Sequence, residues 1–97
     1  MSNRITKSDL DGMVLAINRA AGTPIATYVM VEGKYEPQKG NYFLDSAYGG
    51  HKLVQMGEGT GQRDISKTGF TTKKELYYEM QGYLNGIRDY KYAQEAK

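Results

Sequence analysis

Two helix-start signals, one near each end of the chain, confine any strands to the middle of the sequence. Thr6 and Asp9 have the spacing of a capping box, in which a hydroxyl and an acid three residues later satisfy backbone N–H groups. Thr72 and Glu75 repeat that spacing near the other end. Apolar residues follow each signal at intervals of three and four residues, which places them on one helical face. We therefore expect the chain to begin and end with a helix.

Stop signals and apolar stripes set the extents of the two helices. The first is expected over 7–21, because Gly22 supplies a left-handed stop and Pro24 cannot continue a helix. The second is expected from 72 to about 90, and residues 91–97 are expected to fray. The core stripe of this second helix is expected to comprise Leu76, Met80, Tyr83, Leu84, Ile87 and Tyr90.

The segment between the helices has the alternating pattern of strands. Residues 25–32, 41–46 and 51–56 are expected to be strands, and 33–40 a loop. The glycine-rich stretch 57–69 has room for a short fourth strand. The expected fold is a single α+β domain in the order α-β-β-β-α. In it, two helices pack on a three- or four-stranded antiparallel sheet, with the ordered core running from about residue 5 to 90.

Side-chain chemistry predicts how the second and third strands pair. If residues 47–50 form a four-residue connection, Asp45 faces Lys52 and Leu44 faces Leu53. A two-residue turn at the two glycines would instead place the aspartate opposite a valine. Opposite charges and apolar pairs stabilise directly opposed positions, so the four-residue connection is favoured.

Composition excludes several classes of protein. With 97 residues the chain is one domain, and its net charge of +2 is too small for self-repulsion to favour disorder. The absence of cysteine excludes disulfides, thiolate-ligated zinc and a cysteine nucleophile. A single histidine leaves little from which to build a metal site, and neither a metal nor another cofactor is expected. The first residues lack the apolar core of a signal peptide, and no apolar run is long enough to span a bilayer, so we expect a cytoplasmic protein without a membrane partner.

One serine–histidine pair and one glycine-rich loop contain residue types that occur in chemical sites. Ser46 and His51 flank the predicted connection and should lie opposite one another. Nucleophilic catalysis also needs a group that orients the imidazole and donors that bind an oxyanion, and Asp45 should point to the other face. We therefore expect polar hairpin-end residues and no enzymatic activity. Residues 57–61 lack the Gly-Lys-Ser/Thr of a phosphate-binding loop and predict a mobile connector, with a loop ordered by an anion as the alternative.

A group of cations precedes and opens the second helix. Lys73 and Lys74 lie in its first turn, and Arg63 and Lys67 precede them. Backbone N–H groups at a helix start attract anions, so these four cations predict contact with nucleic-acid phosphates, with a solvated surface as the alternative. The element order with lysines opening the last helix is similar to a double-stranded-RNA-binding domain. The chain departs from that family at Tyr77, where those domains carry a further lysine.

The opposite face of the second helix is a candidate protein interface. Tyr78, Gly82, Asn85 and Tyr92 fall on the side away from the core stripe. A glycine inside a helix lowers the stability of the helix by roughly 1 kcal/mol relative to alanine. The presence of Gly82 and Gly86 in this helix therefore needs an explanation. Either a partner approaches the helix closely there, or another part of the same chain packs against it.

Three segments of the chain resemble short proteins encoded by tailed bacteriophages: MSNRIT, GNYFLDSAYGGHKLVQM and TTKKELYYEMQGYLNGI. The resemblance implies a phage accessory role in the cytoplasm of a bacterial host and supplies no functional residues. Two hypotheses follow, and both leave the oligomeric state open. The first is a small non-catalytic protein that binds nucleic acid through Arg63, Lys67, Lys73 and Lys74. The second is a protein that binds and inhibits or redirects a host protein through Tyr78, Gly82, Asn85 and Tyr92.

Overall fold

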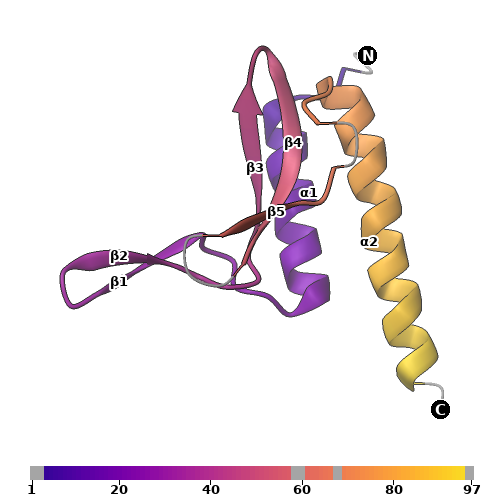
Figure 1. The fold of residues 1–97 in the computed structure, drawn as a ribbon. Helices are drawn as coiled ribbons and strands as arrows, with labels where there is room; N and C mark the ends of the chain where they lie inside the picture. The colour runs from indigo at the N-terminus through magenta and orange to yellow at the C-terminus, as the bar shows by residue number, and fades with distance from the viewer. Residues whose placement is uncertain (1–3, 58–60, 67–68, 96–97) are drawn as a thin grey trace.

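The computed structural model describes residues 4–57, 61–66 and 69–95, and it confirms an α+β domain. Its elements are α1 (Lys7–Ala21), β1 (Tyr28–Val31), β2 (Lys34–Pro37), β3 (Tyr42–Ala47), β4 (Gly50–Met56), β5 (Gln62–Asp64) and α2 (Lys73–Glu95). The two helices lie side by side, with α1 against β3 and α2 against β4. Figure 1 also shows the β1–β2 hairpin projecting away from this body.

The first helix has the expected bounds because both of its ends are capped. The Asp9 backbone N–H donates to the Thr6 hydroxyl over 3.2 Å, and the Thr6 N–H donates to the Asp9 carboxylate over 2.8 Å. Gly22 ends the helix in the left-handed conformation, with φ of 72°. The capping box and the glycine stop are thus confirmed.

The predicted register of β3 and β4 is confirmed. Leu44 lies opposite Leu53 and Asp45 opposite Lys52. The ion pair of Lys52, however, is made with the Asp64 carboxylate of β5, 3.1 Å away, and not with Asp45. The predicted register is therefore correct, while the ion-pair partner of Lys52 comes from the neighbouring strand β5.

The connection between these two strands is shorter than expected. Residues 47–50 were predicted to be the loop, but Ala47 pairs with Gly50 and the turn has only two residues. Tyr48 and Gly49 have φ of 55° and 75°, which is the geometry of a type I′ turn. The strands therefore pair one step further than predicted, in the same register.

The expectation of a loop over 33–40 and of one sheet is wrong. β2 lies inside that segment and pairs with β1 in a separate two-stranded sheet, while β3, β4 and β5 form a three-stranded sheet. Glu32 and Gly33 form the turn, both with positive φ, of 49° and 79°. Glu-Gly is a weaker hairpin signal than Asn-Gly or Asp-Gly, and Pro37 suggested a loop. The short fourth strand allowed within 57–69 exists as β5.

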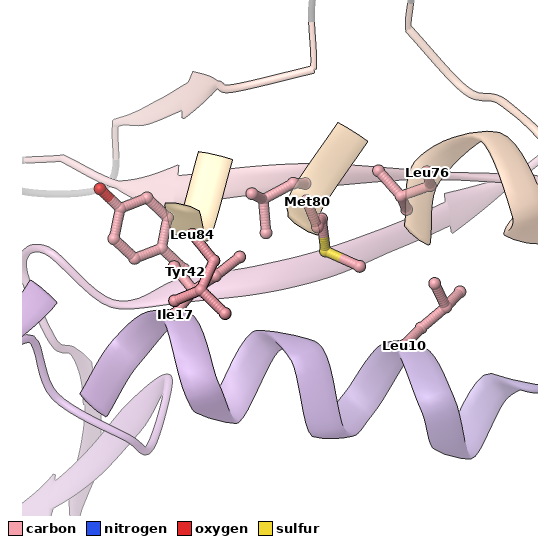
Figure 2. Close-up of a cluster of buried hydrophobic side chains, with 7 residues drawn as sticks. Leu10, Ile17, Tyr42, Leu76, Met80 and Leu84 are labelled. Atoms are coloured by element: carbon pink, nitrogen blue, oxygen red, sulfur yellow. The ribbon is translucent and has the colours of Figure 1, made fainter. Parts of the chain in front are cut away.

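The core lies between the two helices and the three-stranded sheet (Figure 2). The buried members of the predicted α2 stripe are Leu76, Met80 and Leu84. Tyr90 was expected on that stripe but is 66% exposed, and it lines an open groove beside Ala21, the last residue of α1. The helix also continues to Glu95, beyond the expected end at residue 90. The apolar stripe therefore extends further along the helix than the core that covers it.

A buried asparagine joins α1 to the sheet. Asn18 is 1% exposed, and its side-chain N–H donates to the Tyr42 carbonyl over 3.0 Å. Its side-chain oxygen accepts from the Tyr42 N–H over 2.9 Å and from the Thr23 hydroxyl over 2.7 Å. Asn41 holds the segment after α1, because its side-chain N–H donates a hydrogen bond to the Pro24 carbonyl over 2.7 Å.

The Tyr42–Tyr83 pair predicts a loss of stability at alkaline pH. The two hydroxyls are 2.7 Å apart, and burial, followed by this hydrogen bond, raises the pKa of Tyr42 from 10.0 to about 12. The folded state holds this proton more tightly than the unfolded chain does. Its stabilising effect is complete below pH 10.0 and is lost as the pH rises through about 12. We expect Tyr42→Phe to flatten this alkaline decline in the free energy of unfolding, measured by urea denaturation. A variant whose decline parallels that of the wild type would contradict the assignment.

Candidate functional site

The start of α2 is fastened to the start of β4. His51 and Thr71 exchange two backbone hydrogen bonds, each of 2.8 Å. The Thr72 hydroxyl accepts from the Glu75 N–H over 3.2 Å, as the capping signal predicted. Gly50 allows this close approach, because a Cβ there would lie 3.0 Å from the Cβ of Phe70. The first turn of α2 is therefore held against the end of the β3–β4 hairpin.

A pocket of about 330 Å³ lies at this junction. It is lined by Arg4, Ile5, Gly49, His51, Thr72, Lys73 and Lys74. Two lysines of the first helical turn thus share a pocket with an arginine that precedes α1. No carboxylate is among these lining residues, so positive charge is concentrated at the positive end of the helix dipole. We refer to this site as the basic pocket.

The single histidine of the chain stands in the basic pocket as a neutral side chain. Partial burial, followed by the charges of Lys73 and Lys7, lowers the pKa of His51 below its ordinary value. The Ser46 hydroxyl lies 2.6 Å from the His51 Nδ1 atom and fixes one edge of the ring. A neutral imidazole can still donate one hydrogen bond to an anion.

The Ser46–His51 pair lies across the hairpin as predicted, yet it lacks the surroundings of a nucleophilic pair. In such sites a carboxylate orients the histidine and stabilises its protonated form. Here the charges that act on His51 are those of Lys73 and Lys7, which disfavour protonation. The geometry therefore supports a hydrogen bond that holds the ring, and the absence of enzymatic activity stays a prediction.

The structure brings together only part of the predicted nucleic-acid set. Lys73 and Lys74 line the basic pocket. Arg63, in β5, instead donates a hydrogen bond to the side-chain oxygen of Gln55 in β4. Gln55 is four residues from His51, about 13 Å along a strand. Arg63 is therefore at the other end of β4. Lys67 lies outside the described residues, as do residues 58–60 of the glycine-rich loop, so the structure does not bear on either expectation.

Sequence reasoning missed Arg4 and His51 as members of this site. Arg4 precedes α1 and reaches the pocket only because α1 packs beside α2. His51 reaches it through the backbone pairing with Thr71, an isolated bridge with no local sequence signal. A cluster assembled from three distant segments cannot be recognised from the spacing within any one of them.

The predicted interface residues of α2 are exposed but do not form one site. Tyr78 and Tyr92 are 56% and 75% exposed, and Gly82 and Asn85 are exposed as well. Gly82 and Gly86 line a groove of about 580 Å³ together with Ala21, Tyr83, Ile87, Tyr90 and Lys91. Tyr92 instead lines a separate pocket of about 520 Å³ between the helices.

Comparison with protein-family models, curated proteins and solved structures finds no match for this chain. Within the described residues, no helix is both long and apolar enough to cross a membrane. No cluster of three or more histidine, cysteine or acidic side chains occurs in that same part of the chain. The function is therefore inferred from the geometry of the basic pocket and of the exposed surfaces.

Two glycine substitutions should change stability in opposite directions. A Cβ at Gly82 meets no atom within 4 Å, so packing by the described part of the chain does not explain this glycine. We expect Gly82→Ala to raise the free energy of unfolding by roughly 0.5–1 kcal/mol, because alanine favours the helix. We expect Gly50→Ala to lower it by about 1–3 kcal/mol, because the methyl group would collide with Phe70. Thermal or urea melts measure both, and a Gly82→Ala variant less stable than the wild type would contradict the open groove.

Proposed function

We propose that this protein binds nucleic acid by seating a backbone phosphate in the basic pocket. It would act as a small non-catalytic accessory protein of a bacteriophage, in the cytoplasm of the bacterial host. The observation that carries the proposal is the convergence of Arg4, Lys73 and Lys74 on one pocket without a lining carboxylate. Arg4 and the two lysines come from opposite ends of the chain, and only the fold brings them together.

Three properties of the basic pocket favour a phosphate. The first turn of a helix presents unpaired backbone N–H groups and the positive end of the dipole. The lysines and the arginine add charge that can be shared with phosphate oxygens. The His51 ring can contribute a hydrogen bond to the phosphate from an N–H group. A phosphate would offset the mutual repulsion of Lys73 and Lys74, which are adjacent in the first turn of the helix.

Such a site contacts the phosphate backbone of the nucleic acid and not its bases. Contacts to phosphate fix position on the nucleic acid and carry no sequence information. If the three cations neutralise one phosphate each, the seated phosphate and its two neighbours along the strand, the logarithm of the affinity for a duplex should fall with the logarithm of salt concentration with a slope of roughly −2.7. Between 50 and 200 mM salt this corresponds to about a 40-fold loss of affinity.

The paired variant Lys73→Ala, Lys74→Ala tests the proposal. We expect the salt slope to approach roughly −1, because two of three phosphate-facing cations are removed. The measurement is fluorescence anisotropy of a labelled duplex at several salt concentrations. The matched control is Lys34→Ala, Lys91→Ala, which removes the same charge from two exposed lysines outside the basic pocket. Equal losses in both double variants would mean that only the overall charge acts, which would contradict a site.

The single histidine provides a second readout in the wild-type protein. A phosphate in the basic pocket should raise the pKa of His51, because a nearby anion favours the protonated imidazole. Nuclear magnetic resonance titration of this one ring follows the change without ambiguity of assignment. A His51 titration curve unchanged by saturating oligonucleotide would place the nucleic acid elsewhere.

A protein partner on α2 is the second candidate function, favoured by the groove beside Gly82 and Gly86. This groove is bordered by two tyrosine side chains, a residue type that is enriched at protein interfaces, and by an isoleucine. Binding there should depend weakly on salt, in contrast to phosphate binding. It should be reduced by Gly82→Ala, which would leave the nucleic-acid affinity unchanged.

A further inference from the structure

The β1–β2 hairpin forms an apolar arm, comprising residues 28–37, that projects from the body of the protein (Figure 1). Every residue of the arm except its last, Pro37, is exposed. The large apolar side chains among them are between 39% and 73% exposed: Tyr28, Val29, Met30, Val31 and Tyr35. An isolated two-stranded hairpin is marginally stable in water, and three or more strands are needed for independent stability. The arm is therefore suited to being joined by further strands.

The two edges of the arm differ in their protection. β2 carries Lys34, Glu36 and Pro37, and charges and proline are the devices that keep an edge strand from pairing with another chain. β1 has the sequence Tyr-Val-Met-Val, with neither a charge nor a proline. The protected edge and the open edge are thus on opposite sides of the same hairpin.

The hydrogen-bond alternation of the hairpin shows which backbone groups of β1 face outward. Gln38 donates its N–H to the Thr27 carbonyl over 2.8 Å, so this pair is hydrogen-bonded. Antiparallel pairs alternate, so Val29 also bonds within the hairpin, whereas Tyr28 and Met30 direct their N–H and C=O groups away from β2. Within the described part of the chain, these outward groups have no hydrogen-bond partner.

We propose that β1 pairs antiparallel with β1 of a second copy of this chain, about a two-fold axis at Val29. The result is a four-stranded sheet in the order β2-β1-β1-β2. In this register Tyr28 lies opposite Met30 of the second copy, and each such pair exchanges two hydrogen bonds through the outward groups. Val29 lies opposite its own equivalent, as a two-fold axis requires.

A second copy fits this edge because the pairing is self-complementary. No like charges meet, since β1 has none, and Lys34 and Glu36 remain on the outer strands in water. Tyr28 and Met30 share one face with Tyr35, so pairing would make that face continuous across two arms. Antiparallel pairing of projecting arms also places the two bodies at opposite ends of the shared sheet, which keeps them apart.

The proposal is tested by placing a charge on the proposed axis. In Val29→Lys the new ammonium lies across the hairpin from Glu36, so the arm keeps a favourable pair, but it also faces its equivalent in the second copy. The charge-swapped variant Val29→Glu, Glu36→Lys likewise keeps opposite charges across its own hairpin. The control Glu36→Gln raises the net charge by one, as Val29→Lys does, on the outer strand.

Sedimentation equilibrium at protein concentrations of about 1 μM–1 mM measures the average mass of each variant, and so how far it associates. We expect the wild type and Glu36→Gln to shift from the 10.9 kDa monomer toward twice that mass. Each charged variant alone should associate at least tenfold more weakly, and an equimolar mixture of the two should recover a dimer. Circular dichroism melts verify that all variants fold. A monomeric wild type, a Val29→Lys variant that dimerises as the wild type does, or a mixture that fails to associate would each overturn the proposal.

Discussion

The side chain of Asn18 takes the place of a missing strand at the edge of the three-stranded sheet. The N–H and C=O of Tyr42 point away from β4 and would otherwise be buried without partners. The Asn18 amide has one donor and one acceptor at the correct spacing, and it satisfies both groups. Leaving a buried backbone group unpaired costs about 1–3 kcal/mol, so this one residue determines whether α1 can lie against the sheet at all.

The basic pocket depends on that contact. Once the end of α1 is fixed to β3, the start of α1 is carried toward the start of α2, and Arg4 enters the pocket with Lys73. The bridge between His51 and Thr71 fixes the other side. The proposed phosphate site is thus a consequence of two polar contacts between segments far apart in the sequence. The arm, by contrast, lies outside this arrangement, and its proposed role in self-association is independent of nucleic-acid binding.

Signals within short stretches of the sequence were sufficient to predict the first helix and the pairing of β3 with β4. The capping box at Thr6 and the left-handed glycine at Gly22 predicted α1 to the residue, and the opposed charges of Asp45 and Lys52 predicted the β3–β4 register. The β1–β2 arm was missed because its turn uses Glu-Gly and its second strand ends in proline. The pocket was missed in part because Arg4 and His51 converge only through tertiary contacts, which leave no spacing in the sequence. The exposure of Tyr90 was missed for a similar reason, since the stripe predicts which face of the helix is apolar but not how much of that face is covered.

The free energy of unfolding of Asn18→Ala tests most directly the claim that this asparagine fastens the helix to the sheet. Removing the amide leaves both buried backbone groups of Tyr42 without partners, so urea denaturation should show a loss of about 2–6 kcal/mol. Asn85→Ala removes an exposed asparagine from α2 and should stay within about 0.5 kcal/mol of the wild type. An Asn18→Ala variant as stable as this control would contradict the account.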